Sequence, residues 1–166
     1  MTMATTSTGT AVLTTPNDTT IHVVREFDAP RHLVYRAWTT PELVKRWWSG
    51  QRGEVTSAEI DLRVGGRWRY VMVTGEGFEV AFHGEFREIV PDERIVNTEV
   101  YEGMPDGDDD PAVITNSFTE VDGRTTLTMI TEVSSREVRD LIIGSGMEGG
   151  MQESLDALEQ VAVSLR

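Results

Sequence analysis

The sequence predicts an α+β fold in which a curved antiparallel sheet of about seven strands wraps around a long C-terminal helix, with two short helices after the first strand. Two observations predict it. Residues 55–133 alternate between apolar and polar side chains in short runs joined by turns, which is typical of antiparallel strands. The last thirty residues repeat apolar side chains at helical intervals, and only this segment is long enough to cover one face of such a sheet.

The beginning of the chain is expected to form a tail, one strand and the two short helices. Residues 1–20 are rich in threonine and poor in large apolar side chains, so we expect a flexible N-terminal tail there and a single domain over residues 21–166. Residues 21–27 alternate and predict the first strand. Pro30 and Pro41 each stand where a helix can begin, which predicts one helix over residues 31–39 and a second that ends by Gly50.

Six further strands follow, separated by turn residues. They are predicted over residues 55–62, 67–74, 78–90, 94–101, 112–120 and 124–133. Gly65-Gly66 and Asp122-Gly123 have the residue types of tight hairpin turns. Residues 102–111 collect acidic side chains together with glycine and proline, so we expect a solvated loop there.

The segment from Ser135 onward is predicted to be one long amphipathic helix. Its apolar face would carry Leu141, Gly144, Met147, Met151, Leu155, Leu158, Ala162 and Leu165. Gly144, Gly146 and Gly149 also match the G-x-G-x-x-G pattern of dinucleotide sites, but the preceding strand and the following βαβ unit are missing, so no such cofactor is expected. Because glycine weakens a helix, we expect close approach to the sheet to compensate; a local break near Gly149-Gly150 is the alternative.

Composition excludes several classes of function. The chain has 166 residues, no cysteine and a formal net charge of −13. Disulfides and thiol chemistry are therefore excluded, and neither nucleic acid nor an anionic membrane is expected as a partner. No apolar run approaches the ~20 residues of a membrane span, and no signal peptide is recognisable. We therefore expect a cytoplasmic protein.

Four segments follow one another in an order that is typical of one protein family. Starting at residues 25, 59, 84 and 145, they read REFDAPRHLVYRAWTTPELVKRWW, EIDLRVGGRWRY, GEFREIVPDERIV and SGMEGGMQESLDALEQV. They resemble the bacterial AHSA-type family, named after the C-terminal domain of the activator of the heat-shock protein 90 ATPase; Val64 stands where that pattern usually has proline. The family belongs to the START/SRPBCC superfamily. The resemblance therefore implies a helix-grip fold, like that of the birch pollen allergen, with a central cavity.

The first hypothesis for function is binding of a small hydrophobic or aromatic molecule in a cavity between the sheet and the C-terminal helix. Superfamily members bind lipids, sterols or polyketides, and flexible methionines with large aromatic rings suit such a cavity. The candidate ligand-binding residues are Trp47, Trp68, Tyr70, Met72, Phe82, Phe86, Met129, Met147, Glu148 and Met151. The same side chains would equally well fill a solid core. At least one of Trp47 and Trp48 should be exposed or at the rim, because adjacent helical residues point about 100° apart.

The second hypothesis is an enzyme of the cyclase or hydrolase kind, because some superfamily members have these activities. No catalytic motif is present, which leaves Glu148 and His83 as candidate general acid–base groups. Strict alternation places His83 on the outer face of the sheet unless a bulge turns it inward. The three histidines lack metal-binding spacing, so neither a metal nor another cofactor is expected.

The third hypothesis is a protein-interaction role, either as a homodimer or in contact with a chaperone. It requires an exposed apolar patch of several hundred Å². The eukaryotic activator makes much of its chaperone contact through a separate N-terminal domain, for which 166 residues leave no space. Co-chaperone function is therefore not carried over with the family resemblance.

Overall fold

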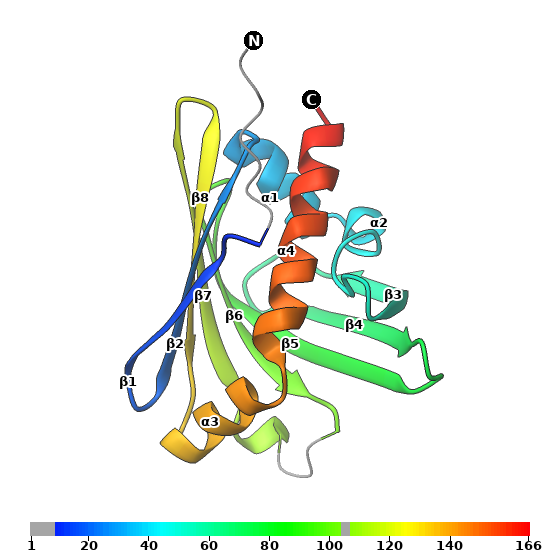
Figure 1. Ribbon diagram of the computed structural model, residues 1–166, viewed down its shortest axis with the longest axis vertical. Coiled ribbons are helices and arrows are strands. Elements are labelled where there is room, and N and C mark those ends of the chain that lie inside the picture. Colours follow the sequence, from blue (N-terminus) through cyan, green and yellow to red (C-terminus); the bar gives the residue numbers. More distant parts are fainter. Residues whose placement is uncertain (1–8, 104–106) are drawn as a thin grey trace.

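The computed structural model describes residues 9–103 and 107–166, and it confirms the α+β fold. Eight strands, rather than about seven, form one antiparallel sheet in the order β1-β2-β8-β7-β6-β5-β4-β3. Their bounds are β1 Val12–Asn17, β2 Thr20–Phe27, β3 Gly53–Ile60, β4 Arg67–Thr74, β5 Glu79–Val90, β6 Arg94–Tyr101, β7 Ala112–Val121 and β8 Arg124–Glu132. The helices are α1 Arg31–Thr39, α2 Pro41–Val44, α3 Arg136–Gly144 and α4 Met147–Ser164, and a 3₁₀ turn, η1, covers Gly107–Asp109. Figure 1 shows the sheet curving around α4, with α3 at the lower end of that helix.

The eighth strand is β1, and it lies where a flexible tail is expected from the sequence. That prediction is wrong for residues 12–17, which pair antiparallel with β2 so that Leu13 lies opposite Val23. Threonine is β-branched and packs well on a pleated surface, which explains how a threonine-rich segment forms a strand. Pro16 is tolerated because β1 is an edge of the sheet. Residues 1–8 of the expected tail lie outside the described residues.

The hairpin between β7 and β8 shows how local sequence sets the register of the sheet. Asp122 and Gly123 have φ angles of 53° and 76°. Positive φ at both central residues is the requirement of a type I′ turn, whose twist matches the flanking strands. The turn leaves Phe118 opposite Leu127 on the inner face of the sheet, by which we mean the face turned toward α4.

The core lies between this inner face and α4. Leu155, Leu158 and Val161 of α4 are buried in one cluster with apolar side chains of the sheet and of α1. Full burial of each such side chain stabilises the fold by about 1.5–3 kcal/mol. The covering role predicted for the C-terminal segment is therefore confirmed for α4.

The C-terminal segment is not one helix, so that part of the prediction is wrong. It divides at Ser145 and Gly146, and Gly146 has a φ of 85° in the left-handed region that favours glycine. The alternative break near Gly149-Gly150 is also wrong, because both residues lie inside α4. Nor do these two glycines allow a close approach to the sheet backbone: an added Cβ at either would meet the Arg52 side chain.

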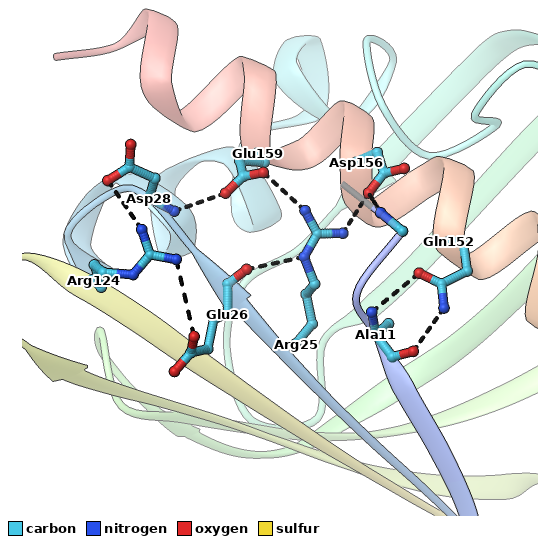
Figure 2. Close-up of polar contacts among 9 residues, drawn as sticks. Ala11, Arg25, Glu26, Asp28, Arg124, Gln152, Asp156 and Glu159 are labelled. Carbon is cyan, nitrogen blue, oxygen red and sulfur yellow. Dashed lines mark hydrogen bonds and ion pairs between the residues drawn. The ribbon is translucent and has the colours of Figure 1, made fainter. Parts of the chain in front are cut away.

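A buried group of charges fastens α4 to the sheet. Arg25 of β2 has a fully buried side chain and forms ion pairs with Asp156 and Glu159 of α4. Its Nε donates to the Glu26 carbonyl, and Glu159 also accepts a hydrogen bond from the backbone N–H of Asp28. Figure 2 shows this arrangement, with the guanidinium reaching from the strand to the helix. Losing one partner of such a buried pair costs about 3–5 kcal/mol, so the pair holds α4 in place only when complete.

Candidate functional site

Four aromatic side chains lie together on the inner face near the lower half of α4, and we call them the aromatic patch: Trp48, Tyr70, Phe82 and Tyr101. The ring of Trp48 meets the rings of Tyr70 and Phe82 edge-on, with centroids 5.4 Å and 5.5 Å away. Phe82 stacks on Tyr101 at 5.2 Å. Tyr101 is nevertheless 43% exposed, and Trp48 and Phe82 are only half-buried. The patch is therefore apolar surface that the core does not fully cover.

The residues predicted to line a cavity divide into three groups. Trp47, Trp68, Tyr70 and Phe86 are buried members of the core cluster. Phe82, Met129 and Met151 are half-buried and pack against that cluster, and Met72 and Met147 are half-buried as well. Glu148 is exposed. Trp47 belongs to the core because its indole N–H donates to the Ala37 carbonyl at 3.0 Å, so the residue expected at the rim is Trp48.

Two hollows formed by the described residues lie elsewhere. One of about 570 Å³ opens at the surface of α3 and is lined by Glu137, Asp140, Leu141, Gly144 and Ser145. The other, of about 300 Å³, is lined by Arg31, Val90, Glu93, Arg94, Ser117, Phe118 and Thr119. Neither hollow is lined by any of the residues predicted to bind a ligand. The centre of the inner face is packed, and exposed aromatic surface is found toward the end of the sheet that carries Tyr101.

Polar groups lie on the inner face beside the aromatic patch. The indole N–H of Trp68 donates to the Thr98 carbonyl at 3.1 Å, and the Asn97 side chain donates to the same oxygen at 3.0 Å. Gly84 makes this possible, because a Cβ there would lie 2.6 Å from the Trp68 indole nitrogen. Asn116 donates to Asn97 at 3.2 Å, while its own Oδ1 has no hydrogen-bond partner among the described residues.

Glu99 is the acidic side chain that sequence reasoning missed. It shares the inner face of β6 with Asn97 and Tyr101 because residues two apart in a strand point the same way. It is half-buried, and burial raises its pKa to about 7. Burial and the nearby Glu99 carboxylate also raise the pKa of Tyr70 above its ordinary value. The alternation Ile95, Asn97, Glu99, Tyr101 was the available signal, since it places an acid in phase with a buried isoleucine.

The structure places both candidates for general acid–base catalysis away from the inner face. Glu148 is exposed at the start of α4, so nothing in its surroundings prepares it for proton transfer. His83 pairs with Arg69 and Val100 in the sheet register and points to the outer face, as strict alternation predicts. The cyclase- or hydrolase-like mechanism that uses Glu148 or His83 stays a prediction, and neither residue lies on the inner face of the sheet.

His83 instead connects the sheet to the acidic loop. Its Nδ1 lies 2.8 Å from a Glu102 oxygen and its Nε2 lies 2.7 Å from an Asp108 oxygen. Burial lowers the pKa of His83, but these hydrogen bonds outweigh it and raise the pKa above the ordinary value. Hydrogen bonding from Arg69 is the main reason that the pKa of Glu102 lies well below its usual range. These three side chains bind the loop to the outer face of the sheet, whereas the aromatic patch lies on the inner face.

The chemistry available on the inner face is apolar contact with one ionisable end. Aromatic rings and methionines offer contact area, and Glu99 and the Tyr70 hydroxyl offer hydrogen bonds. Within residues 9–103 and 107–166, no three His, Asp or Glu side chains are grouped so that they could hold a metal ion. Among the same residues no helix has both the length and the apolar character needed to cross a membrane.

Comparisons with solved structures show the same fold in proteins from several bacteria. A protein from Rhodobacter sphaeroides has a TM-score of 0.83 and 23% identity, and the match covers 93% of this chain and 99% of that one. Protein Ms6760 from Mycobacterium smegmatis has a TM-score of 0.81 and 21% identity, with 94% and 99% covered. Protein SA2116 from Staphylococcus aureus, described as of unknown function, has a TM-score of 0.66 and 20% identity, with 88% and 95% covered. At these identities the likeness shows the fold alone.

The sequence itself matches one protein family over most of its length. No curated protein matches the chain. The family described as Activator of Hsp90 ATPase homolog 1-like protein matches residues 28–162, which run from the end of β2 into α4. Its helix-grip architecture is consistent with binding of a hydrophobic ligand. The chain therefore belongs to this family of SRPBCC proteins.

Proposed function

We propose that this protein binds a small apolar or aromatic molecule against the aromatic patch, on the inner face of the sheet near the start of α4. The observation that supports the proposal is the incomplete burial of the patch. Three of its four rings keep exposed surface although they face toward α4, and Tyr101 is 43% exposed. A ligand that covers these rings gains about 25 cal/mol for each Å² of apolar surface removed from water.

Half-buried methionines make this site adaptable. Met129 and Met151 pack against the core from β8 and α4 and keep part of their surface exposed. Methionine is unbranched and changes conformation at little cost, so such a surface accommodates ligands of different shape. We therefore propose that the site selects ligands by size and apolar character, with hydrogen bonds from Tyr70 on β4 and Glu99 on β6 as a polar contribution.

Tryptophan fluorescence tests the proposal, because Trp48 belongs to the patch whereas Trp38 packs against Trp47 and Phe118. Titration with a panel of small aromatic hydrocarbons should give a saturable change that is lost in Trp48→Phe and kept in the matched control Trp38→Phe. Calorimetry should show that Phe82→Ala weakens binding about tenfold, since it removes one ring of the patch. Absence of saturable binding across the panel, by both methods, would contradict the proposal.

A further inference from the structure

Two polar groups on the inner face have no hydrogen-bond partner among the residues that the structure describes. Tyr70 is 9% exposed, and its hydroxyl makes no hydrogen bond with any described residue. The hydroxyl oxygen is not fully buried, so a ligand can reach it. The Glu99 carboxyl likewise makes no hydrogen bond or ion pair with residues 9–103 or 107–166. Tyr70 lies close enough to Glu99 to feel its charge. Both groups are therefore available to a ligand that also contacts the aromatic patch.

The neighbours of Glu99 across the sheet have a small side chain or none. Ala112 of β7 lies opposite it. On the other side Gly84 falls opposite Glu99 in the register that pairs His83 with Val100 and Phe86 with Asn97. The Trp68 indole lies where a side chain at Gly84 would stand. Neither Gly84 nor Ala112 offers a polar side-chain group, so these two neighbours do not complete the contacts of the Glu99 carboxyl.

No cation among residues 9–103 and 107–166 forms an ion pair with Glu99. The basic side chains nearest along the sheet, Arg69 and His83, lie on the outer face, where they are occupied by Glu102. Arg52, which faces α4, pairs with Glu153. The acidic loop begins directly after Tyr101, and the whole chain carries a net charge of −13. The field at this end of the inner face therefore attracts cations and repels anions.

We propose, building on the function proposed above, that the ligand is an aromatic or apolar amine whose ammonium group contacts Glu99 and Tyr70. The carboxylate accepts a hydrogen bond from the ammonium, and the Tyr70 oxygen can accept a second. The rings of the aromatic patch add cation–π attraction, which contributes about 0.5–2 kcal/mol for each well-placed ring. Together these contacts replace the hydration that the ammonium loses.

The ionisation of Glu99 gives the proposal a second signature. Burial raises the pKa of this carboxyl to about 7, so near neutral pH about half of the molecules carry a proton there. An ammonium ligand favours the carboxylate and expels that proton. A ligand with only a carbonyl group would do the reverse, because it accepts a hydrogen bond from the protonated acid.

Three probes of similar size distinguish these cases by calorimetry: phenethylamine, the hydrocarbon propylbenzene and the ketone phenylacetone. The native protein should bind phenethylamine about tenfold more tightly than propylbenzene. Measured in two buffers of different ionisation enthalpy near neutral pH, this binding should release about half a proton. Glu99→Gln should abolish both the preference and the proton release while it still binds propylbenzene. Tyr70→Phe should weaken the binding of phenethylamine more than the binding of propylbenzene.

The matched control is Glu85→Gln, which removes a carboxylate from an exposed position on the neighbouring strand and should keep the preference for the amine. Equal affinity for amine and hydrocarbon, or tightest binding of the ketone with proton uptake, would overturn the ammonium proposal and leave the hydrophobic-ligand function intact. Failure of all three probes to bind would contradict that function itself.

Discussion

Glu99 occupies a position on the inner face that an apolar side chain would fill at lower cost. A carboxyl group in a poorly hydrated place resists ionisation, which is why burial raises its pKa to about 7. Groups that weaken the native state in this way concentrate at functional sites. The stability of the protein therefore carries information about the site, even before a ligand is found.

Replacement of Glu99 should change the pH dependence of stability. The folded-state pKa of about 7 lies above the ordinary pKa of 4.5, so the native state is favoured at low pH and loses stability as the pH rises through about 7. Glu99→Gln removes this loss. Urea unfolding should show similar stabilities for the two proteins at about pH 5, and an advantage for the variant on the order of 2 kcal/mol at about pH 8.5. Equal stabilities at both pH values would show that Glu99 ionises freely.

The same residue marks the limit of sequence reasoning about the site. Alternation predicts which face a strand residue takes, and it correctly places His83 outside. It does not reveal which polar residue on the inner face lacks a partner, because partners come from other strands. Trp47 and Trp48 show the same limit: the sequence predicts that at least one of the two is exposed or at the rim, but only the hydrogen bond from Trp47 to the Ala37 carbonyl shows which one belongs to the core.

At the scale of single elements, turns and strands are the parts that the sequence predicts well. The bounds predicted for residues 67–74 and 94–101 agree with β4 and β6, because strong alternation ends in turn residues. The single long C-terminal helix is wrong because helical periodicity survives an interruption of two residues. Apolar side chains continue on both sides of Gly146, and only its φ of 85° reveals the break.

Two glycines of this segment should respond oppositely to alanine. Gly146→Ala places a side chain in a left-handed conformation and should lower the free energy of unfolding by about 1–2 kcal/mol. Gly150→Ala lies inside α4, where the added Cβ makes only ordinary contact with the Arg52 side chain, and should raise it by about 0.5–1 kcal/mol. Thermal and urea unfolding of the two variants provide the measurement, each serving as the control for the other. Stabilisation by both would mean that α3 and α4 can join into one helix.

At the scale of the whole molecule, the fold depends on the order in which the strands pair and on the helix α4 that covers the sheet. The predicted topology of sequential antiparallel strands is confirmed from β3 to β8, where each strand pairs with the next. The pairing of β2 with β8 and the addition of β1 depend on contacts between distant parts of the chain, which periodicity does not report. A homodimer or a chaperone contact stays a prediction, since the exposed large apolar side chains lie on separate strands, turns and α3.

The ion pairs of Arg25 join the two layers, so their removal should affect the whole fold. Arg25→Met leaves Glu159 buried without its cation and should destabilise the protein by about 3–5 kcal/mol in urea unfolding. The double variant Arg25→Met with Glu159→Gln should recover part of this loss, because the glutamine oxygen still accepts from Asp28 and the only carboxylate left without its cation is Asp156, whose side chain is 26% exposed. A double variant as unstable as Arg25→Met would mean that packing of the arginine, and not its charge, is what matters.

The hydrogen bonds between the residue before β1 and the last helix also bear on how the protein folds during its synthesis. Ala11 exchanges two hydrogen bonds with Gln152, a residue synthesised 141 positions later. While the ribosome is still adding those residues, the nascent strands have no α4 to cover the apolar inner face of the sheet. Folding therefore cannot be completed before α4 has been synthesised, and until then the inner face of the sheet stays exposed to water.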